Sequence, residues 1–243
     1  MKPPVFFTAG QSDALQYARN QLLQWGYKVL PQPNDQITHL LLPVPSFEAP
    51  GILKGNAAFS EVVERLANNV TILGGNLPQL PFSAVDFLKD EHYLGENAAI
   101  TVHCALKILQ QHAGDLAGAK ILVIGWGRIG KRLVSLLSAQ NALVSVAVRK
   151  SSDAQALGQL GYTALIPPQW DLIQYNIIIN TAPTLLFSES AANPAAFLLD
   201  LASTRGIEGK RVIWARGLPN RDAPDASGLL IAKTALRYAL GKE

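Results

Sequence analysis

The sequence predicts an α/β protein of two α/β domains, the C-terminal one built on a doubly wound parallel sheet. Two observations lead to this prediction. Short apolar runs rich in β-branched residues alternate with amphipathic helical stretches, and one β-α-β unit, residues 120–151, contains a glycine-rich turn. The 243 residues are 49% hydrophobic and 16% charged, which is typical of a globular protein with a sizeable core.

The central unit begins with the apolar run Ile121–Ile124, which has the length and branching of a buried parallel strand. The turn Gly125-Trp126-Gly127-Arg128-Ile129-Gly130 follows. An amphipathic helix then ends near Asn141, and a second apolar run covers residues 143–148. About thirty residues is the length that a β-α-β unit needs.

Each glycine of this turn has a separate task in dinucleotide binding. Gly125 permits the tight turn, Gly127 lets a phosphate approach the backbone, and Gly130 lets helix and strand pack closely. A diphosphate would then bind free N–H groups at the positive end of the helix dipole. A glycine-rich turn can also be purely structural, but strand, turn, helix and strand are all in register here. The sequence therefore predicts a Rossmann domain that binds NAD(P) through all six residues of the turn.

Basic residues follow the second strand of the unit. The strand ends in Arg149-Lys150-Ser151, where an NAD-binding domain carries an acid for the ribose 2′-hydroxyl. A 2′-phosphate would pair with Arg149 and Ser151, so NADP is favoured as the cofactor and NAD is the alternative. The competing interpretation is a solvated basic surface.

The predicted domains are residues 1–94, an N-terminal substrate or partner domain, and residues 95–243, the NAD(P)-binding Rossmann domain. A long helix over 97–111 connects them, and the cleft between them is the expected active site. The last helix, 227–240, packs either on the first domain or against a second subunit. Further elements are expected as strands at 5–8, 27–30, 39–42, 70–73, 163–166, 177–179, 197–199 and 212–214, and as helices at 12–25, 59–66 and 154–160.

Composition argues against several functional classes. The net charge of +3 is mild and its basic residues form no long stripe, so we expect no nucleic-acid partner. We find no signal-peptide pattern and no apolar window that would span a bilayer, and therefore expect a cytoplasmic protein without a membrane partner. The single cysteine, Cys104, fits a reducing compartment. His39, His92 and His112 lack metal-ligand spacing, so no metal is expected.

Several motifs in their order along the chain resemble the A subunit of dipicolinate synthase. These motifs are Asn97–Val102, the GWGRIG turn, Val148–Ser152, Asn180–Pro183, Leu199–Ser203 and Gly217–Pro219, with weaker matches at Leu42–Val44 and Gly74-Gly75. Each motif alone is unspecific, but their order and spacing are specific, and the resemblance covers essentially the whole chain.

This resemblance implies an oxidoreductase. In the implied reaction, dihydrodipicolinate, or a close precursor from the lysine pathway, loses a hydride and a proton and becomes an aromatic pyridine dicarboxylate. The resemblance also implies a partner, which would be a flavoprotein-like B subunit, and a place in sporulation. We further expect a homodimer.

The chain departs from the family pattern at two places. Ile100-Thr101-Val102-His103-Cys104 stands where the family has Pro-Thr-Val-Glu-Gly, and Thr204-Arg205-Gly206 stands where it has a basic residue, proline and glycine. An imidazole in place of a carboxylate changes which proton transfers are available.

The resemblance makes the position of His103 the first candidate for a catalytic acid or base. Asn97 and Thr101, one helical turn apart, are the other catalytic candidates, because they would donate hydrogen bonds to a substrate carboxylate or carbonyl. The alternatives are that His103 is an ordinary core or interface residue and that Asn97 only caps the connecting helix.

The remaining candidates follow strand ends of the second domain. Thr181, Ala182 and Pro183 would face the nicotinamide and its ribose. Arg205 and Arg216, with Ser203, would bind a dicarboxylate, because bidentate pairing suits arginine. Either arginine could instead be a surface ion-pair residue.

Two other functions compete with this interpretation. A D-2-hydroxyacid dehydrogenase is suggested by a likeness at Ser203–Gly206, but such enzymes need a histidine well after the arginine, and none follows His112. The second rival is a non-catalytic nucleotide-binding regulatory subunit. It stays open because the family's carboxylate is absent.

Overall fold

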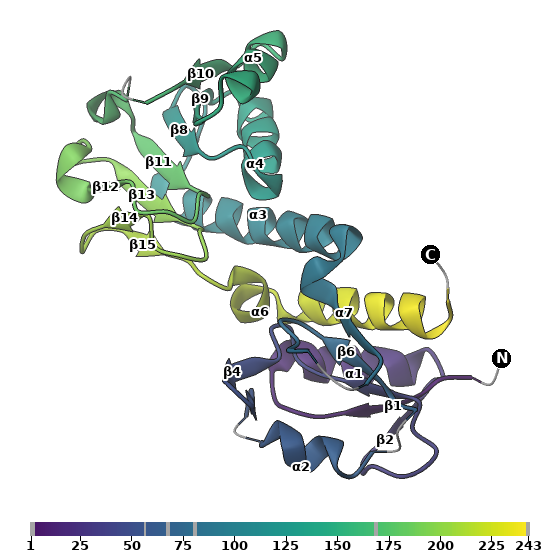
Figure 1. Cartoon of the computed structure of the whole chain (residues 1–243). Helices are drawn as coiled ribbons and strands as arrows, with labels where there is room; N and C mark the ends of the chain where they lie inside the picture. The colour runs from purple at the N-terminus through teal and green to yellow at the C-terminus, as the bar shows by residue number, and fades with distance from the viewer. Residues whose placement is uncertain (1–2, 56, 67–68, 80–81, 168–169, 242–243) are drawn as a thin grey trace. The chain divides into compact units, whose positions relative to one another are not determined.

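Two compact units make up the chain in the computed structural model (Figure 1), which describes residues 3–241 apart from 56, 67–68, 80–81 and 168–169. The first unit comprises residues 1–100 and 219–243, and the second comprises residues 101–218. Helix α3 (Glu91–Ala113) contains the point at which the first unit passes into the second.

The first unit is built on a parallel sheet with the strand order β2-β1-β3-β6-β7. This is the flavodoxin-like order of a doubly wound sheet. The strands are β1 (Val5–Thr8), β2 (Lys28–Leu30), β3 (His39–Leu41), β6 (Thr71–Gly74) and β7 (Ala84–Asp86). The other elements are the helices α1 (Asp13–Gln24), α2 (Phe59–Val63) and α7 (Pro224–Ala239), the hairpin β4 (Phe47–Ala49) with β5 (Ile52–Leu53), and the 3₁₀ turn η1 (Phe87–Lys89).

Helix α1 forms where its cap and apolar spacing predict it. Ser12, where the predicted helix begins, is its N-cap, because its hydroxyl accepts a hydrogen bond from the backbone N–H of Leu15 at 3.1 Å. Ala14, Leu15, Ala18 and Leu22 are buried at helical spacing. Trp25, where the predicted helix ends, is the C-cap residue and remains 39% exposed.

Helix α7 belongs to the first unit, because it packs along α1 (Figure 1). The contact is close at Gly228. A Cβ there would overlap the Cβ of Tyr17 and lie 2.6 Å from the carbonyl oxygen of Ala14. The units therefore differ from the predicted ranges of 1–94 and 95–243, since residues 219–243 return to the first unit and the division within α3 follows Ile100. Of the two packing alternatives for the last helix, the structure shows contact with the first unit.

Helix α3 begins at Glu91, six residues before its predicted start at Asn97. Asp90 terminates the preceding turn, and its carboxylate accepts a hydrogen bond from the backbone N–H of Tyr93 at 2.8 Å. That is the contact of an N-cap. The interpretation of Asn97 as the helix cap is therefore wrong, because Asn97 lies in the second turn.

The second unit is built on a parallel sheet with the strand order β10-β9-β8-β11-β13-β15. Numbered within this unit the order is 3-2-1-4-5-6, the order of the Rossmann fold, and the predicted fold class is confirmed. The strands are β8 (Lys120–Ile124), β9 (Leu143–Ala147), β10 (Thr163–Leu165), β11 (Ile177–Asn180), β13 (Phe197–Asp200) and β15 (Ile213–Trp214). The other elements are α4 (Arg128–Ala139), α5 (Ser151–Gln159), η2 (Leu172–Gln174), η3 (Glu189–Ala191) and the small pair β12 (Phe187–Ser188) with β14 (Ile207–Glu208). Helix α6 (Leu218–Asp222) begins at the last residue of this unit and continues into the first unit.

The central β-α-β unit forms as its periodicity predicts. Ile121–Ile124 are at most 2% exposed, as expected of a parallel strand covered on both faces. In α4, Leu133 and Leu137 are fully buried one turn apart, whereas Leu136 is 43% exposed. Helix α5 begins at Ser151, directly after Lys150, and not at the predicted residue 154.

Candidate nucleotide-binding site

The glycine-rich turn joins the carboxyl end of β8 to α4, and its glycines are needed for different reasons. Gly125 has φ +104°, a conformation that favours glycine, and a Cβ there would lie 2.5 Å from the Thr181 hydroxyl. A Cβ at Gly130 would overlap the carbonyl oxygen of Gly125, whereas one at Gly127 would meet nothing within 4 Å. The turn thus leaves open space at Gly127, beside the N-terminus of α4.

A cavity of about 320 Å³ lies at this turn, where the carboxyl ends of β8, β9 and β11 meet. Ligands of doubly wound sheets bind at this edge. Eight of the twelve predicted cofactor residues line the cavity: Gly125, Trp126, Gly127, Arg149, Lys150, Thr181, Ala182 and Pro183. The other four, Arg128, Ile129, Gly130 and Ser151, lie on the flanking helices and are not among the lining residues.

Sequence reasoning missed several residues of the cavity wall, of which Asp153, Trp170 and Leu186 differ most in chemistry. Asp153 lies in the first turn of α5, three residues after Lys150. It brings a carboxylate to a wall that otherwise carries the exposed cations Arg149 and Lys150. The acid was visible in the sequence, but only the start of α5 at Ser151 turns it toward this strand end.

The segment Thr181–Pro183 is held in place through a hydrogen-bonded pair of side chains at the ends of neighbouring strands, Asn180 and Asp200. Asn180 and Asp200 lie side by side on β11 and β13, and both are fully buried. The Asn180 amide donates to Asp200 Oδ1 at 2.9 Å and to the carbonyl oxygen of Ala182 at 3.1 Å. Its own oxygen accepts the N–H of Ala182 at 2.9 Å. The pair therefore fixes one wall of the cavity.

The predicted dicarboxylate-binding residues follow β13 and β15 at the same edge of the sheet. Ser203 and Arg216 are exposed. Arg205 donates from Nε to the carbonyl of Ile207 at 3.0 Å and from its terminal nitrogen to that of Gly209 at 2.5 Å. These bonds favour a structural role for Arg205, because they use donors that a substrate carboxylate would need.

The three catalytic candidates lie on α3. Asn97 is half-buried, Thr101 is 7% exposed and His103 is exposed. Thr101 and His103 therefore present different faces of the helix, as residues two apart must. Their catalytic roles stay a prediction.

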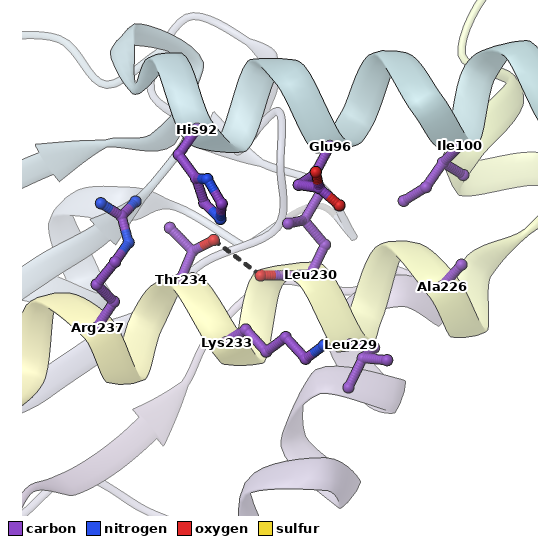
Figure 2. A pocket seen from close by; sticks show the side chains of 9 residues that line it. All are labelled: His92, Glu96, Ile100, Ala226, Leu229, Leu230, Lys233, Thr234 and Arg237. Atoms are coloured by element: carbon purple, nitrogen blue, oxygen red, sulfur yellow. Dashed lines mark hydrogen bonds between the residues drawn. The ribbon is translucent and has the colours of Figure 1, made fainter.

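A second cavity, of about 530 Å³, lies within the first unit between the start of α3 and α7. Figure 2 shows His92 and Glu96 of α3 on one side and Lys233 and Arg237 of α7 on the other. None of the predicted site residues lines this cavity. Its wall carries both signs of charge.

Asp90, which is 8% exposed, contacts Arg237, a residue of this second cavity's wall. Asp90 forms an ion pair with Arg237 and accepts a hydrogen bond from the Tyr238 hydroxyl at 2.5 Å. Burial raises the pKa of Asp90, but the hydrogen bonds from Tyr238, Tyr93 and Arg237 and the charge of Arg237 outweigh it and hold the pKa below its ordinary value of 3.8. Stability gained from a lowered carboxyl pKa is present above that value and is lost as the pH falls below it.

We expect Tyr238→Phe to lower the free energy of unfolding at pH 7 by about 1 kcal/mol, because it removes a hydrogen bond to a charged group that is partly open to water. The difference from the wild type should shrink as the pH falls through the lowered pKa of Asp90, which lies below the ordinary value of 3.8. Urea unfolding at pH 7 and at a series of acid pH values measures both effects. Tyr17→Phe, at an exposed tyrosine of α1, is the control, and an equal loss in that variant would refute the role of the Tyr238 hydroxyl.

No described helix combines the length and the apolar character that crossing a membrane requires. No cluster of three or more His, Cys, Asp or Glu side chains able to hold a metal ion occurs in the described part of the chain.

Comparison with known proteins shows similarity at the level of the fold. No protein-family model matches the chain, and no curated protein matches it. Among solved structures, dipicolinate synthase from Bacillus subtilis, in its A chain, is 20% identical with a TM-score of 0.81, over 100% of this chain and 98% of that one. The A subunit of dipicolinate synthase from Bacillus halodurans is 19% identical with a TM-score of 0.80, over 98% and 97%.

A transhydrogenase from Sinorhizobium meliloti is also similar, at 15% identity and a TM-score of 0.70, over 96% of this chain and 92% of that one. At these identities the comparisons establish the fold, and function must be argued from the site. The two dipicolinate synthase structures are nevertheless of the family that the sequence motifs resemble.

Proposed function

We propose that this protein is an NADP-linked oxidoreductase that dehydrogenates a dihydropyridine dicarboxylate, the reaction expected of the A subunit of dipicolinate synthase. One observation carries the proposal: a cavity at the switch point of a Rossmann sheet combines the open Gly127 turn with Arg149 and Lys150 at the next strand end. The two similar dipicolinate synthase structures support the choice of reaction.

The residues of the cavity fit a dinucleotide. Backbone N–H groups at Gly127 and the start of α4 would hold the diphosphate, since no side chain fills the space there. Arg149 and Lys150 would hold a 2′-phosphate, two cations against the single carboxylate of Asp153. Thr181, Ala182 and Pro183 would face the nicotinamide, which when bound accepts the hydride.

Residues of this chain would orient the substrate and take its proton. Arg216, exposed after β15, is the cation that we propose for a substrate carboxylate, and Ser203, exposed after β13, is the proposed hydrogen-bond donor. As the substrate loses its hydride it also loses a proton, which we assign to His103 as the base. Asn97 and Thr101 would donate hydrogen bonds to the second carboxylate. The internal bonds of Arg205 count against a D-2-hydroxyacid dehydrogenase, whose arginine must reach substrate.

The cofactor is tested by titrating NADP⁺ and NAD⁺ into the wild type and Arg149→Ala by calorimetry. Losing a hydrogen bond to a charged group is worth about 1.5–3 kcal/mol, so NADP⁺ binding should weaken tenfold or more while NAD⁺ binding hardly changes. Arg132→Ala, an exposed cation of α4 outside the cavity, is the matched control. Equal losses for both cofactors would show that Arg149 does not recognise the 2′-phosphate.

Turnover of dihydrodipicolinate by the isolated chain tests the reaction. Cofactor binding without turnover would favour the alternative, a non-catalytic nucleotide-binding subunit that needs a partner. We propose two assemblies, a homodimer and a complex with a flavoprotein-like B subunit. Light scattering of the chain alone tests the first, and co-purification tests the second.

A further inference from the structure

Asp200 is a buried carboxylate that forms no ion pair with any residue that the structure describes. Its side chain is fully buried at the end of β13. Four donors converge on its two oxygens. Oδ1 accepts from the Asn180 amide at 2.9 Å and from the N–H of Ala202 at 3.0 Å, and Oδ2 accepts from the N–H groups of Gly206 at 2.7 Å and Ile207 at 3.0 Å.

These contacts satisfy the two carboxylate oxygens as hydrogen-bond acceptors, but none of the four donors carries a positive charge. A carboxylate that only accepts hydrogen bonds is ionised, because a protonated one would donate from one oxygen. Removing a charged group from water has a large free-energy cost, and buried charges are usually paired with an opposite charge. An unbalanced negative charge is therefore free to act on a positive charge nearby.

Asp200 lies directly behind one wall of the nucleotide cavity. Asn180 connects the two, because its amide donates both to Asp200 and to the carbonyl oxygen of Ala182, a lining residue. The chain beyond β13 approaches from the same side, and a Cβ at Gly206 would lie 2.6 Å from the carbonyl oxygen of Thr184, also a lining residue. This wall belongs to β11, on the opposite side of the Gly125 turn from Arg149.

We propose that Asp200 makes this cavity select the oxidised form of the nicotinamide cofactor over the reduced form. The inference rests on the proposed function. With the 2′-phosphate at Arg149 and the diphosphate at the turn, the nicotinamide end of the dinucleotide lies against the β11 wall. The oxidised ring carries a positive charge and the reduced ring is neutral, so a buried anion behind that wall stabilises only the oxidised form.

The selection has a consequence for turnover. Hydride transfer from the substrate would neutralise the bound ring, with the substrate's proton going to the base, so Asp200 would no longer favour binding. The site would then release the reduced cofactor and would take up the oxidised one when both are present.

The experiment compares dissociation constants of NADP⁺ and NADPH for the wild type, Asp200→Asn and Asp153→Asn. The wild type should bind NADP⁺ at least as tightly as NADPH. Asp200→Asn should lower the preference for NADP⁺ by roughly tenfold. Asp153→Asn removes a charge at the other end of the cavity and should change both constants by the same factor. 2′-Phospho-ADP-ribose, a fragment of NADP that lacks the nicotinamide ring, should bind the wild type and Asp200→Asn with the same affinity.

Other results would contradict either the inference or the proposed function on which it rests. Two results would give Asp200 a structural role only. One is an unchanged preference for NADP⁺ in folded Asp200→Asn, and the other is an equal loss of affinity for NADP⁺, NADPH and 2′-phospho-ADP-ribose. If Asp200→Asn does not fold, the wild type decides, and a wild-type preference for NADPH overturns the inference. Absence of any nucleotide binding by the wild type would instead overturn the proposed function itself.

Discussion

Replacing Gly130 with alanine should abolish nucleotide binding and lower the free energy of unfolding by about 1–3 kcal/mol. Gly130 lies in the first turn of α4, where an added Cβ would overlap the carbonyl oxygen of Gly125. This carbonyl belongs to the backbone and cannot swing aside as a flexible side chain would, and Gly125 already holds a φ of +104°. Relief requires α4 to move away from β8, which deforms the turn that would hold the diphosphate. Urea unfolding and a nucleotide titration measure the two effects.

Gly158→Ala is the matched control for this prediction. Gly158 lies within α5, and a Cβ there would meet nothing within 4 Å. The same substitution should therefore leave binding intact and raise stability by roughly 0.5–1 kcal/mol, because alanine loses less conformational entropy in a helix. Wild-type nucleotide affinity in Gly130→Ala would contradict the assignment of the turn as the binding element.

Replacing His103 with glutamine should lower turnover by a hundredfold or more, on the scale of general acid–base catalysis. Glutamine keeps the approximate size and a hydrogen-bonding group but cannot take a proton near neutral pH. In the wild type, activity should fall on the acid side of the pH–rate profile, because a protonated base accepts no proton. That limb of the pH–rate profile should be absent in His103→Gln.

His92→Gln is the control, since His92 is exposed on the same helix and lies in the first unit. It should keep both the rate and the pH profile. If His103→Gln also keeps both, His103 is a structural residue and the catalytic assignment passes to Asn97 and Thr101, with Thr101→Val as the next variant.

Sequence alone determined the central β-α-β unit and the position of its glycine-rich turn. The reason is physical: the pattern is local, so the run Ile121–Ile124, the three glycines and the spacing of Leu133 and Leu137 already specify strand, turn and helix. The same holds for α1, whose cap is provided by a residue next to it in the chain. The cations Arg149 and Lys150 were likewise found from their place directly after a strand.

Only the tertiary structure decided which residues from distant segments meet. Asp200 and Asn180 become neighbours because β13 pairs with β11, and no periodicity shows that their side chains share a hydrogen bond. Helix α3 begins at Glu91 beside Asp90, whose partners Arg237 and Tyr238 come from the far end of the chain.

The packing of α7 on the first unit is likewise decided by contacts between segments that are distant in the sequence. Its apolar face could have packed on several surfaces, and the close fit of Gly228 against Ala14 and Tyr17 selects α1. Arg205 looked like a substrate-binding residue until the loop after β13 brought the carbonyls of Ile207 and Gly209 to its guanidinium. Local pattern thus determined the elements and the turn, whereas non-local packing, which has no signature in a single sequence, decided the partners of the polar side chains.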